Sequence, residues 1–186
     1  MKQLFTAALL VLGLSVANAQ SSFNLQVLQD ARLAVSDDDN GNEAFTPNLL
    51  FGIEYQHLQK YRSVGYMTYG LTYEYADLFG GPYNRVGTTV GYNFNTILDG
   101  VEFGLNASYG GIHRFQDWYG SYGGNAFIAI NIVDNIQLTA NLQYTQRSDL
   151  RVNFNDNEDG RISGFIGFKF NFLNCNCTKK ESVWRR

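Results

Sequence analysis

The sequence is poor in cysteine, proline and charge: its 186 residues include two Cys and two Pro, and charged residues make up 17%. Cys175 and Cys177 are too few and too close together to form a disulfide framework. Lys and Arg number 14 against 17 Asp and Glu, which gives a net charge of -3 and leaves no basic stripe for nucleic acid. Beyond the first twenty residues, no apolar run reaches the length of about 20 residues that a transmembrane helix requires. These absences argue against a disulfide-stapled domain, a nucleic-acid-binding protein and a helical membrane protein.

The N-terminal segment has the pattern of a secretory signal peptide. Lys2 supplies the positive charge, and a mostly apolar run follows over residues 4–16. Ala17-Asn18-Ala19 then provides the small residues that signal peptidase reads. No cysteine follows directly, which argues against a lipid anchor. We therefore predict a signal peptide over residues 1–19 and an exported mature chain.

Aromatic residues and glycine, by contrast, are abundant, with 12 Tyr, 14 Phe and 19 Gly. Phe and Tyr favour pleated strands. An excess of both, together with few charges, is typical of strands that face lipid on one side.

The most informative pattern is a long alternation of apolar and polar residues. Between residues 23 and 36 the even positions are mostly polar, and the odd positions are nearly all apolar. These odd positions are Phe23, Leu25, Val27, Gln29, Ala31, Leu33 and Val35. A strand of a globular protein usually has about 5–6 residues, whereas a strand that crosses a membrane needs about 9–11. The alternation therefore predicts a membrane-spanning strand.

The same alternation recurs seven more times along the chain. The eight predicted strands cover residues 23–36, 45–56, 67–75, 85–94, 101–109, 122–132, 136–145 and 161–172. Inside lipid every backbone polar group must be paired, so a sheet that crosses a membrane has to close on itself. We predict an all-β fold: an eight-stranded antiparallel up-and-down transmembrane β-barrel formed by residues 20–173.

The charged residues within these segments lie on the polar faces. A charge on the lipid face near the membrane midplane would cost about 2–4 kcal/mol. Eight charged residues are predicted to point into the lumen as one network: Asp30, Arg32, Glu54, Glu74, Arg85, Glu102, Arg161 and Lys169. An eight-stranded barrel is just wide enough for side chains to fill it. We expect a filled lumen, with a narrow porin-like channel for small solutes as the alternative.

Aromatic residues gather at both ends of the apolar stripes, as in the girdles that barrels place at membrane–water interfaces. The connections are predicted to alternate in length. Tight turns are expected at residues 58–62, 95–99 and 133–135, and longer loops at residues 36–43, 77–84, 114–121 and 147–160. Short periplasmic turns and long extracellular loops are typical of outer-membrane barrels.

With these features the chain resembles the small eight-stranded outer-membrane proteins of the OmpA/OmpX type and, more broadly, the outer membrane protein beta-barrel domain family. The resemblance implies a place in the bacterial outer membrane and insertion by the barrel-assembly machinery. It also implies an insertion signal in the last strand, matched here by Gly167, Phe170 and Phe172, with Phe165 where a polar residue is usual. The chain continues past Phe172, and we expect residues 174–186 to form a short basic periplasmic tail. Its Cys-x-Cys pair is only half of a zinc site.

No catalytic constellation is visible, and neither a cofactor nor a metal site is predicted. A hydrolase needs a nucleophile that is oriented by a base. His57 and His113 are predicted at opposite rims of the barrel, so they cannot form one site. The barrels that deacylate lipid A carry His-x-Ser, but Phe115 stands at the position of that serine. We expect a non-enzymatic protein.

The predicted outer loops hold the remaining candidates. Two acidic runs, residues 37–43 and 153–160, suit hard cations such as Ca²⁺ but lack the Glu that an EF-hand requires at its twelfth position. We interpret them as solvated loop tips, with weak binding of divalent ions beside lipopolysaccharide phosphates as the alternative. Phe115, Trp118 and Tyr119 either contact a partner or complete the outer girdle.

The function hypothesis is a structural or surface-interaction role through the extracellular loops. The alternatives are the narrow channel and, third, a soluble periplasmic β-barrel that binds an apolar ligand. We expect a monomer whose partners are outer-membrane lipid and lipopolysaccharide, with no nucleic acid and with any host ligand unidentified.

Overall fold

The structure is a computed structural model that describes residues 21–37, 42–57, 65–78, 81–95, 100–154 and 159–172. The predicted signal peptide, residues 1–19, and the predicted tail, residues 174–186 with Cys175 and Cys177, lie outside the described residues. So do residues 38–41 and 155–158, which form the middle of the two acidic runs.

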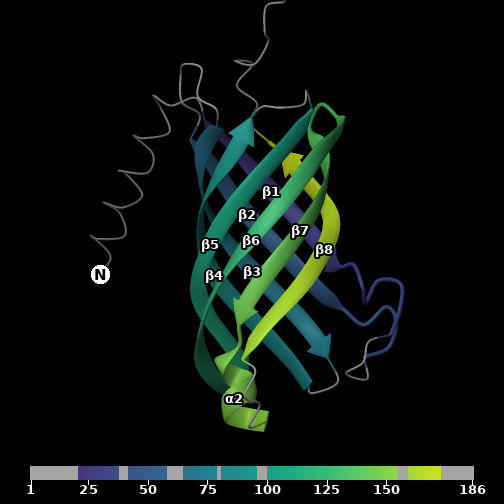
Figure 1. Cartoon of the computed structure of the whole chain (residues 1–186), viewed down its shortest axis with the longest axis vertical. Helices are drawn as coiled ribbons and strands as arrows, with labels where there is room; N and C mark the ends of the chain where they lie inside the picture. The colour runs from purple at the N-terminus through teal and green to yellow at the C-terminus, as the bar shows by residue number, and fades with distance from the viewer. Residues whose placement is uncertain are drawn as a thin grey trace, which may run out of the picture.

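Eight antiparallel strands form a closed barrel in which each strand pairs with its neighbours along the chain and β1 pairs with β8 (Figure 1). The strands are β1 (Ser21–Asp30), β2 (Asn48–His57), β3 (Gly65–Leu78), β4 (Gly81–Asn95), β5 (Val101–Arg114), β6 (Asp117–Val133), β7 (Ile136–Gln146) and β8 (Gly160–Asn171). The predicted all-β, eight-stranded, up-and-down architecture is confirmed.

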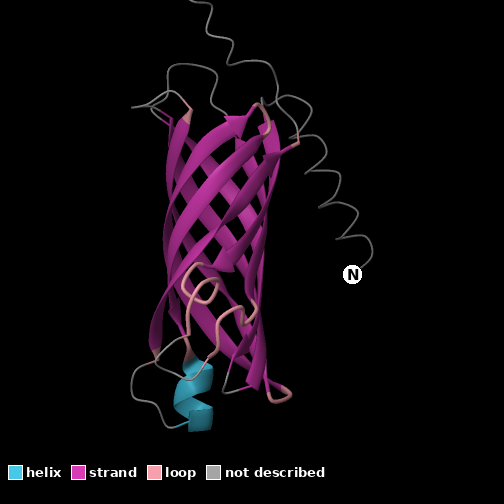
Figure 2. Ribbon diagram, turned by 90° about the vertical axis from the view of Figure 1, so that its right-hand side faces the viewer, coloured by secondary structure: helices cyan, strands magenta, loops and turns pink. Residues whose placement is uncertain are grey.

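Among the described residues, one end of the barrel carries a helix. A short helix, α2 (Ser148–Phe154), follows β7 and lies beyond the strand ends (Figure 2). We call this the helix end of the barrel, and the opposite end, where β1 begins and β8 ends, the terminal end. Among the described residues, no helix is long and apolar enough to cross a membrane.

The first predicted strand was too long. β1 ends at Asp30, because the Asp30 carboxylate accepts hydrogen bonds from the backbone amides of Arg32 (3.0 Å) and Leu33 (3.3 Å) and turns the chain. Arg32 is therefore exposed in a turn, not placed on a strand face as expected. Phe45 was predicted to begin the second strand, but it lies in the loop with a φ of 65° and is exposed.

Two of the four connections predicted to be long are instead tight hairpins. β3 and β4 stay paired as far as Leu78 and Gly81, and β5 and β6 as far as Arg114 and Asp117. The reason is that backbone pairing continues beyond the apolar stripes from which the strand ends were predicted. The tight turn after Val133 is confirmed. The connection after β7 is long, as predicted, but it contains helix α2.

Candidate functional site

The interior of the barrel is the candidate site, because it collects most of the buried charge of the described chain. Side chains alternate between the two sides of each strand, and the polar positions face inward. On β2, for example, Glu54 is 8% exposed while the adjacent Ile53 is 55% exposed. Large apolar side chains are exposed on the outer face of β2 to β8, as shown by Leu71, Leu105 and Leu142, whereas those on the outer face of β1 are partly buried.

At the terminal end, two carboxylates share one buried ammonium group. The Nζ atom of Lys169 lies 2.9 Å from Oε1 of Glu102 and 3.3 Å from Oε1 of Glu54. Asn24 and Gln56 donate to Glu54 at 3.2 and 2.9 Å. Three strands contribute the ions, namely β2, β5 and β8. We call Glu54, Glu102 and Lys169 the terminal-end cluster.

A glycine makes room for this cluster. The ring of Phe127 covers Gly104, and a Cβ atom at Gly104 would lie 2.2 Å from a Phe127 ring carbon and 2.5 Å from Oδ1 of Asn93. Asn93 in turn donates to Glu102 at 2.6 Å, and Lys169 lies 5.1 Å from the centre of the Phe127 ring. The close approach of these side chains therefore requires glycine at position 104.

Apolar side chains fill the next part of the interior. Along β1, β2 and β8, the positions toward the helix end from Asn24, Glu54 and Lys169 include Leu28, Leu50 and Phe165, which pack together and are each 1% exposed. Gly167 lies against this contact, since a Cβ atom there would meet the backbone of Val27. Phe165 thus has a packing role inside the barrel, which explains an aromatic residue where a polar one is usual.

A second group of charges lies toward the helix end. Glu74 accepts hydrogen bonds from Tyr83 and, at 3.0 Å, from Gln143, and Arg85 lies 3.8 Å from it. Arg85 also donates to Ser121 at 3.1 Å and to Ser108 at 2.7 Å.

The same group continues into the connection that holds α2. Both Asp149 oxygens accept hydrogen bonds from Arg147 at 2.8 Å, and Arg114 donates to one of them at 3.2 Å. The Arg147 guanidinium lies 3.8 Å from the centre of the Tyr83 ring, a cation–π contact. We call Glu74, Arg85, Arg114, Arg147 and Asp149 the helix-end cluster.

Asp149 stays ionised in this setting. Burial by itself would raise the pKa of its carboxyl group, but the hydrogen bonds and charges of Arg147 and Arg114 outweigh burial and hold the pKa below its usual range. The carboxylate is fully buried, with an exposed fraction of 0%.

The eight charged residues predicted to line the lumen have different locations. Glu54, Glu74, Arg85, Glu102 and Lys169 are buried in the two clusters. Asp30 is buried too, but its contacts are the turn amides and Asn48. Arg161 lies at the helix-end start of β8, where it donates to the Gly160 carbonyl. Arg32 lies in the turn beyond β1, outside both clusters.

The sequence-based prediction missed three charged residues of the helix-end cluster. Arg114, Arg147 and Asp149 fall in segments that were assigned to loops. The sequence signal for the two arginines is the alternation of inward and outward residues. The inward even positions of β5 continue to Arg114, and the inward odd positions of β7 continue to Arg147. No comparable signal marks Asp149, because it follows the strand.

The predicted partner-contacting residues lie on the β5–β6 hairpin. Phe115 is in its two-residue turn, Trp118 is 64% exposed and packs against His113, and Tyr119 donates to Asn153 of α2. His57 pairs with Ser21 at the terminal end, so the two histidines are at opposite ends of the barrel. Among the described side chains, no group of three or more His, Cys, Asp or Glu residues is arranged to hold a metal ion.

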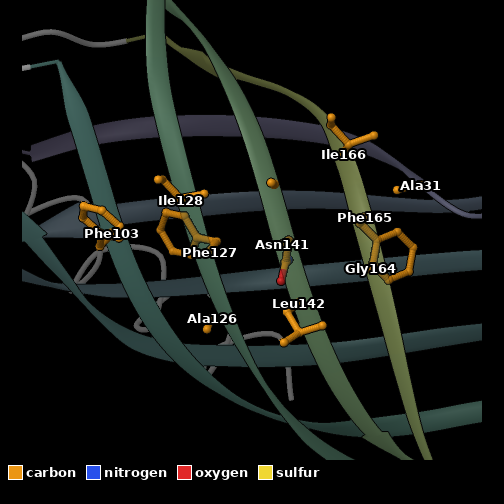
Figure 3. Close-up of a pocket in the computed structure, with 11 residues that line it drawn as sticks. Ala31, Phe103, Ala126, Phe127, Ile128, Asn141, Leu142, Gly164, Phe165 and Ile166 are labelled. Atoms are coloured by element: carbon orange, nitrogen blue, oxygen red, sulfur yellow. The ribbon is translucent and has the colours of Figure 1, made fainter.

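An apolar groove runs along the outer face of β6, β7 and β8, and Figure 3 shows its lining. Its floor consists of small residues, including Ala126, Ala140 and Gly164, and its walls include Leu142 and Ile166. Of the predicted insertion-signal residues, Phe172 is exposed and Phe170 is partly buried on the outer face of β8.

No protein-family model matches this chain, and no curated protein matches it. Three solved structures are similar to it. The outer membrane protein Ail of Yersinia pestis in a phospholipid bilayer nanodisc has 14% identity and a TM-score of 0.47, covering 83% of this chain and 100% of that one. Neisserial surface protein A has 9% identity and a TM-score of 0.46, covering 83% and 98%. The crystal structure of Ail has 14% identity and a TM-score of 0.44, covering 83% and 99%. At these values the comparison transfers neither a site nor an activity to this chain.

Proposed function

We propose that this chain is a non-enzymatic outer-membrane β-barrel protein with a side-chain-filled lumen and a structural or surface-interaction role. The observation that carries the proposal is the inverted distribution of side chains. Charged residues are buried inside, while large apolar residues such as Ile53, Leu71 and Leu142 are exposed outside. A soluble protein rarely exposes a continuous apolar surface, whereas a barrel in lipid requires one.

The alternative of a soluble barrel that binds an apolar ligand requires the opposite arrangement. Its cavity would be apolar and its outer face charged. Here the interior holds Lys169 and Arg85, each 2% exposed. The exposed apolar face therefore favours lipid as the surrounding medium.

The aromatic residues on the outer face support the same placement. Phe23 and Tyr55 pair at 5.3 Å and Tyr92 and Phe94 at 5.0 Å near the terminal end. Tyr109 and Tyr122 are directly opposite each other nearer the helix end. Tyr and Trp concentrate where a membrane meets water. The barrel would then place its terminal end in the periplasm and its helix end outside the cell.

Membrane fractionation tests the placement. The full chain, expressed with its leader, should sediment with outer membranes and migrate differently on a gel before and after heating. Recovery of the folded protein in the soluble periplasm would overturn the proposal. Stable, large conductance steps from the purified protein in planar bilayers would instead favour the porin-like channel.

Labelling of intact cells tests the orientation. In a C175S/C177S background, Gln116→Cys in the β5–β6 turn should react with a large polyethylene-glycol maleimide. Asp134→Cys, in the β6–β7 turn at the terminal end, should react only after the outer membrane is permeabilised. The reverse result would invert the assignment of inside and outside.

The contact residues on the hairpin are the candidates for a surface role. Phe115 and Trp118 are more than half exposed on the helix-end hairpin. Lipopolysaccharide is the partner expected from their position. Replacing both residues by Ser should weaken retention of the purified barrel by lipopolysaccharide-containing vesicles if they bind it. Unchanged retention would assign them to the girdle alone.

A further inference from the structure

We propose that helix α2 is a lid over the helix end of the barrel, and that the buried Asp149 carboxylate holds this lid closed. The proposal concerns only the barrel interior and does not depend on which membrane surrounds the barrel.

The helix itself supplies little of the holding force. α2 has seven residues, and isolated helices shorter than about 12–15 residues are marginal in water. Three successive residues of the helix, Arg151, Val152 and Asn153, are exposed. Segments with few buried apolar contacts open with small free energies. A polar attachment must therefore determine whether the helix stays in place.

Asp149 provides this attachment. It is the one fully buried side chain of α2 among the described residues, and it accepts hydrogen bonds from two arginines. Arg114 comes from the end of β5, and Arg147 follows the end of β7. The carboxylate thus ties the helix to the end of β5 and to the residue directly after β7, two strands that are not neighbours in the barrel. A carboxylate that receives hydrogen bonds from guanidinium groups makes some of the strongest polar contacts in proteins.

Weaker contacts align the lid without replacing this attachment. The hydroxyl of Ser148 donates to the Gly120 carbonyl at 2.9 Å, and Tyr119 donates to Asn153 at 3.2 Å. Both contacts are exposed, so water competes for the same groups.

The interior beneath the lid is polar, and the helix-end cluster within it carries a net positive charge. Arg147 covers Tyr83, Tyr83 donates to Glu74, and Glu74 pairs with Arg85. The helix-end cluster has three guanidinium groups and two carboxylates. Lifting α2 would admit water to this cluster, down to Leu28, Leu50 and Phe165. The opening is therefore a blind vestibule that favours anions.

Cysteine accessibility tests the lid. Ser121 is 1% exposed and contacts Arg85, so it reports on the space below α2. In a C175S/C177S background, the purified folded barrel with Ser121→Cys is treated with an anionic methanethiosulfonate. We expect Asp149→Asn to increase the reaction rate at least tenfold. Asp117→Asn, which removes an exposed carboxylate from the same end, should leave the rate unchanged.

A second variant covers the case in which Asp149→Asn does not fold. Residues 148–154 are replaced by a Gly/Ser segment of equal length, which leaves every strand residue in place. This variant should show the same increase, with the anionic reagent faster than its cationic analogue. Heat-modifiable migration verifies that each barrel is folded. Unchanged labelling in a folded variant of either kind would overturn the lid, as would an equal increase in Asp117→Asn.

Discussion

The two charged clusters inside the barrel have opposite charge ratios. The terminal-end cluster surrounds one ammonium group with two carboxylates, whereas the helix-end cluster combines three guanidinium groups with two carboxylates. The first draws all its ions from strands, and the second takes Arg147 and Asp149 from a connection. The terminal end is thus fixed by strand register, while the helix end also depends on a segment that can move without breaking the barrel.

The largest effect is expected from removing the single cation of the terminal-end cluster. Lys169→Met leaves Glu54 and Glu102 buried without a counter-charge. Breaking a buried ion pair on one side costs about 3–5 kcal/mol, so the free energy of unfolding in urea should fall by about this amount. Arg151→Met, which removes a cation that is 65% exposed, is the control and should have little effect.

Removing the two carboxylate charges together with the ammonium group tests the same cluster further. The triple variant Lys169→Met, Glu54→Gln and Glu102→Gln replaces the ions together and should recover much of the lost stability. If Lys169→Met is as stable as the unmodified chain, the cluster does not contribute to folding through its charges.

A smaller loss is expected at the helix end. Arg85→Met removes one of three guanidinium groups, and Glu74 keeps its hydrogen bonds from Tyr83 and Gln143. The free energy of unfolding should fall by about 1–3 kcal/mol, as for a lost partner of a buried polar group. Urea unfolding compares it directly with Lys169→Met. A larger loss at Arg85 than at Lys169 would contradict the role of charge ratio.

How much of this could be predicted from sequence differs between the two clusters. Glu54, Glu102 and Lys169 could be placed inward by alternation alone, because a charge on the opposite face would meet lipid. Which of these residues pair with each other could not be predicted from sequence, because Lys169 and Glu102 are 67 residues apart and meet only through the stagger of the closed barrel.

The helix end was harder to predict for a different reason. The outward positions of β5 and β6 beyond Tyr109 and Tyr122 are Gly111 and Gly120, so the apolar stripe stops while the backbone pairs continue. The strand ends were therefore placed too early, and Arg114 fell into a predicted loop. Backbone hydrogen bonding extends these hairpins beyond the apolar stripe, where only the inward alternation that ends at Arg114 marks the strand.

Packing at the terminal end can be probed without changing charge. Gly104→Ala places a methyl group within 2.2 Å of the Phe127 ring, and overpacking of this kind costs about 1–3 kcal/mol. Gly164→Ala is the matched control, because a Cβ atom at that position would have no neighbouring atom within 4 Å. Thermal unfolding should show a loss for the first variant only. Equal melting temperatures for both would mean that the Phe127 ring moves aside freely.

The smallest effect is the pH response of the lid. The pKa of Asp149 is lower in the folded chain than in the unfolded one. The ionised carboxylate therefore stabilises the closed lid fully above the unfolded pKa of about 3.9. This stabilisation of the closed lid is lost as the pH falls through the lower pKa of the folded chain. The ratio of the labelling rate at Ser121→Cys in Asp149→Asn to that with the unmodified Asp149 should stay constant from about pH 8 to pH 5 and shrink only below about pH 4. Reagent reactivity cancels in this ratio because both proteins carry the same cysteine. A ratio that fell to one between pH 7 and pH 5 would show that another group controls the lid.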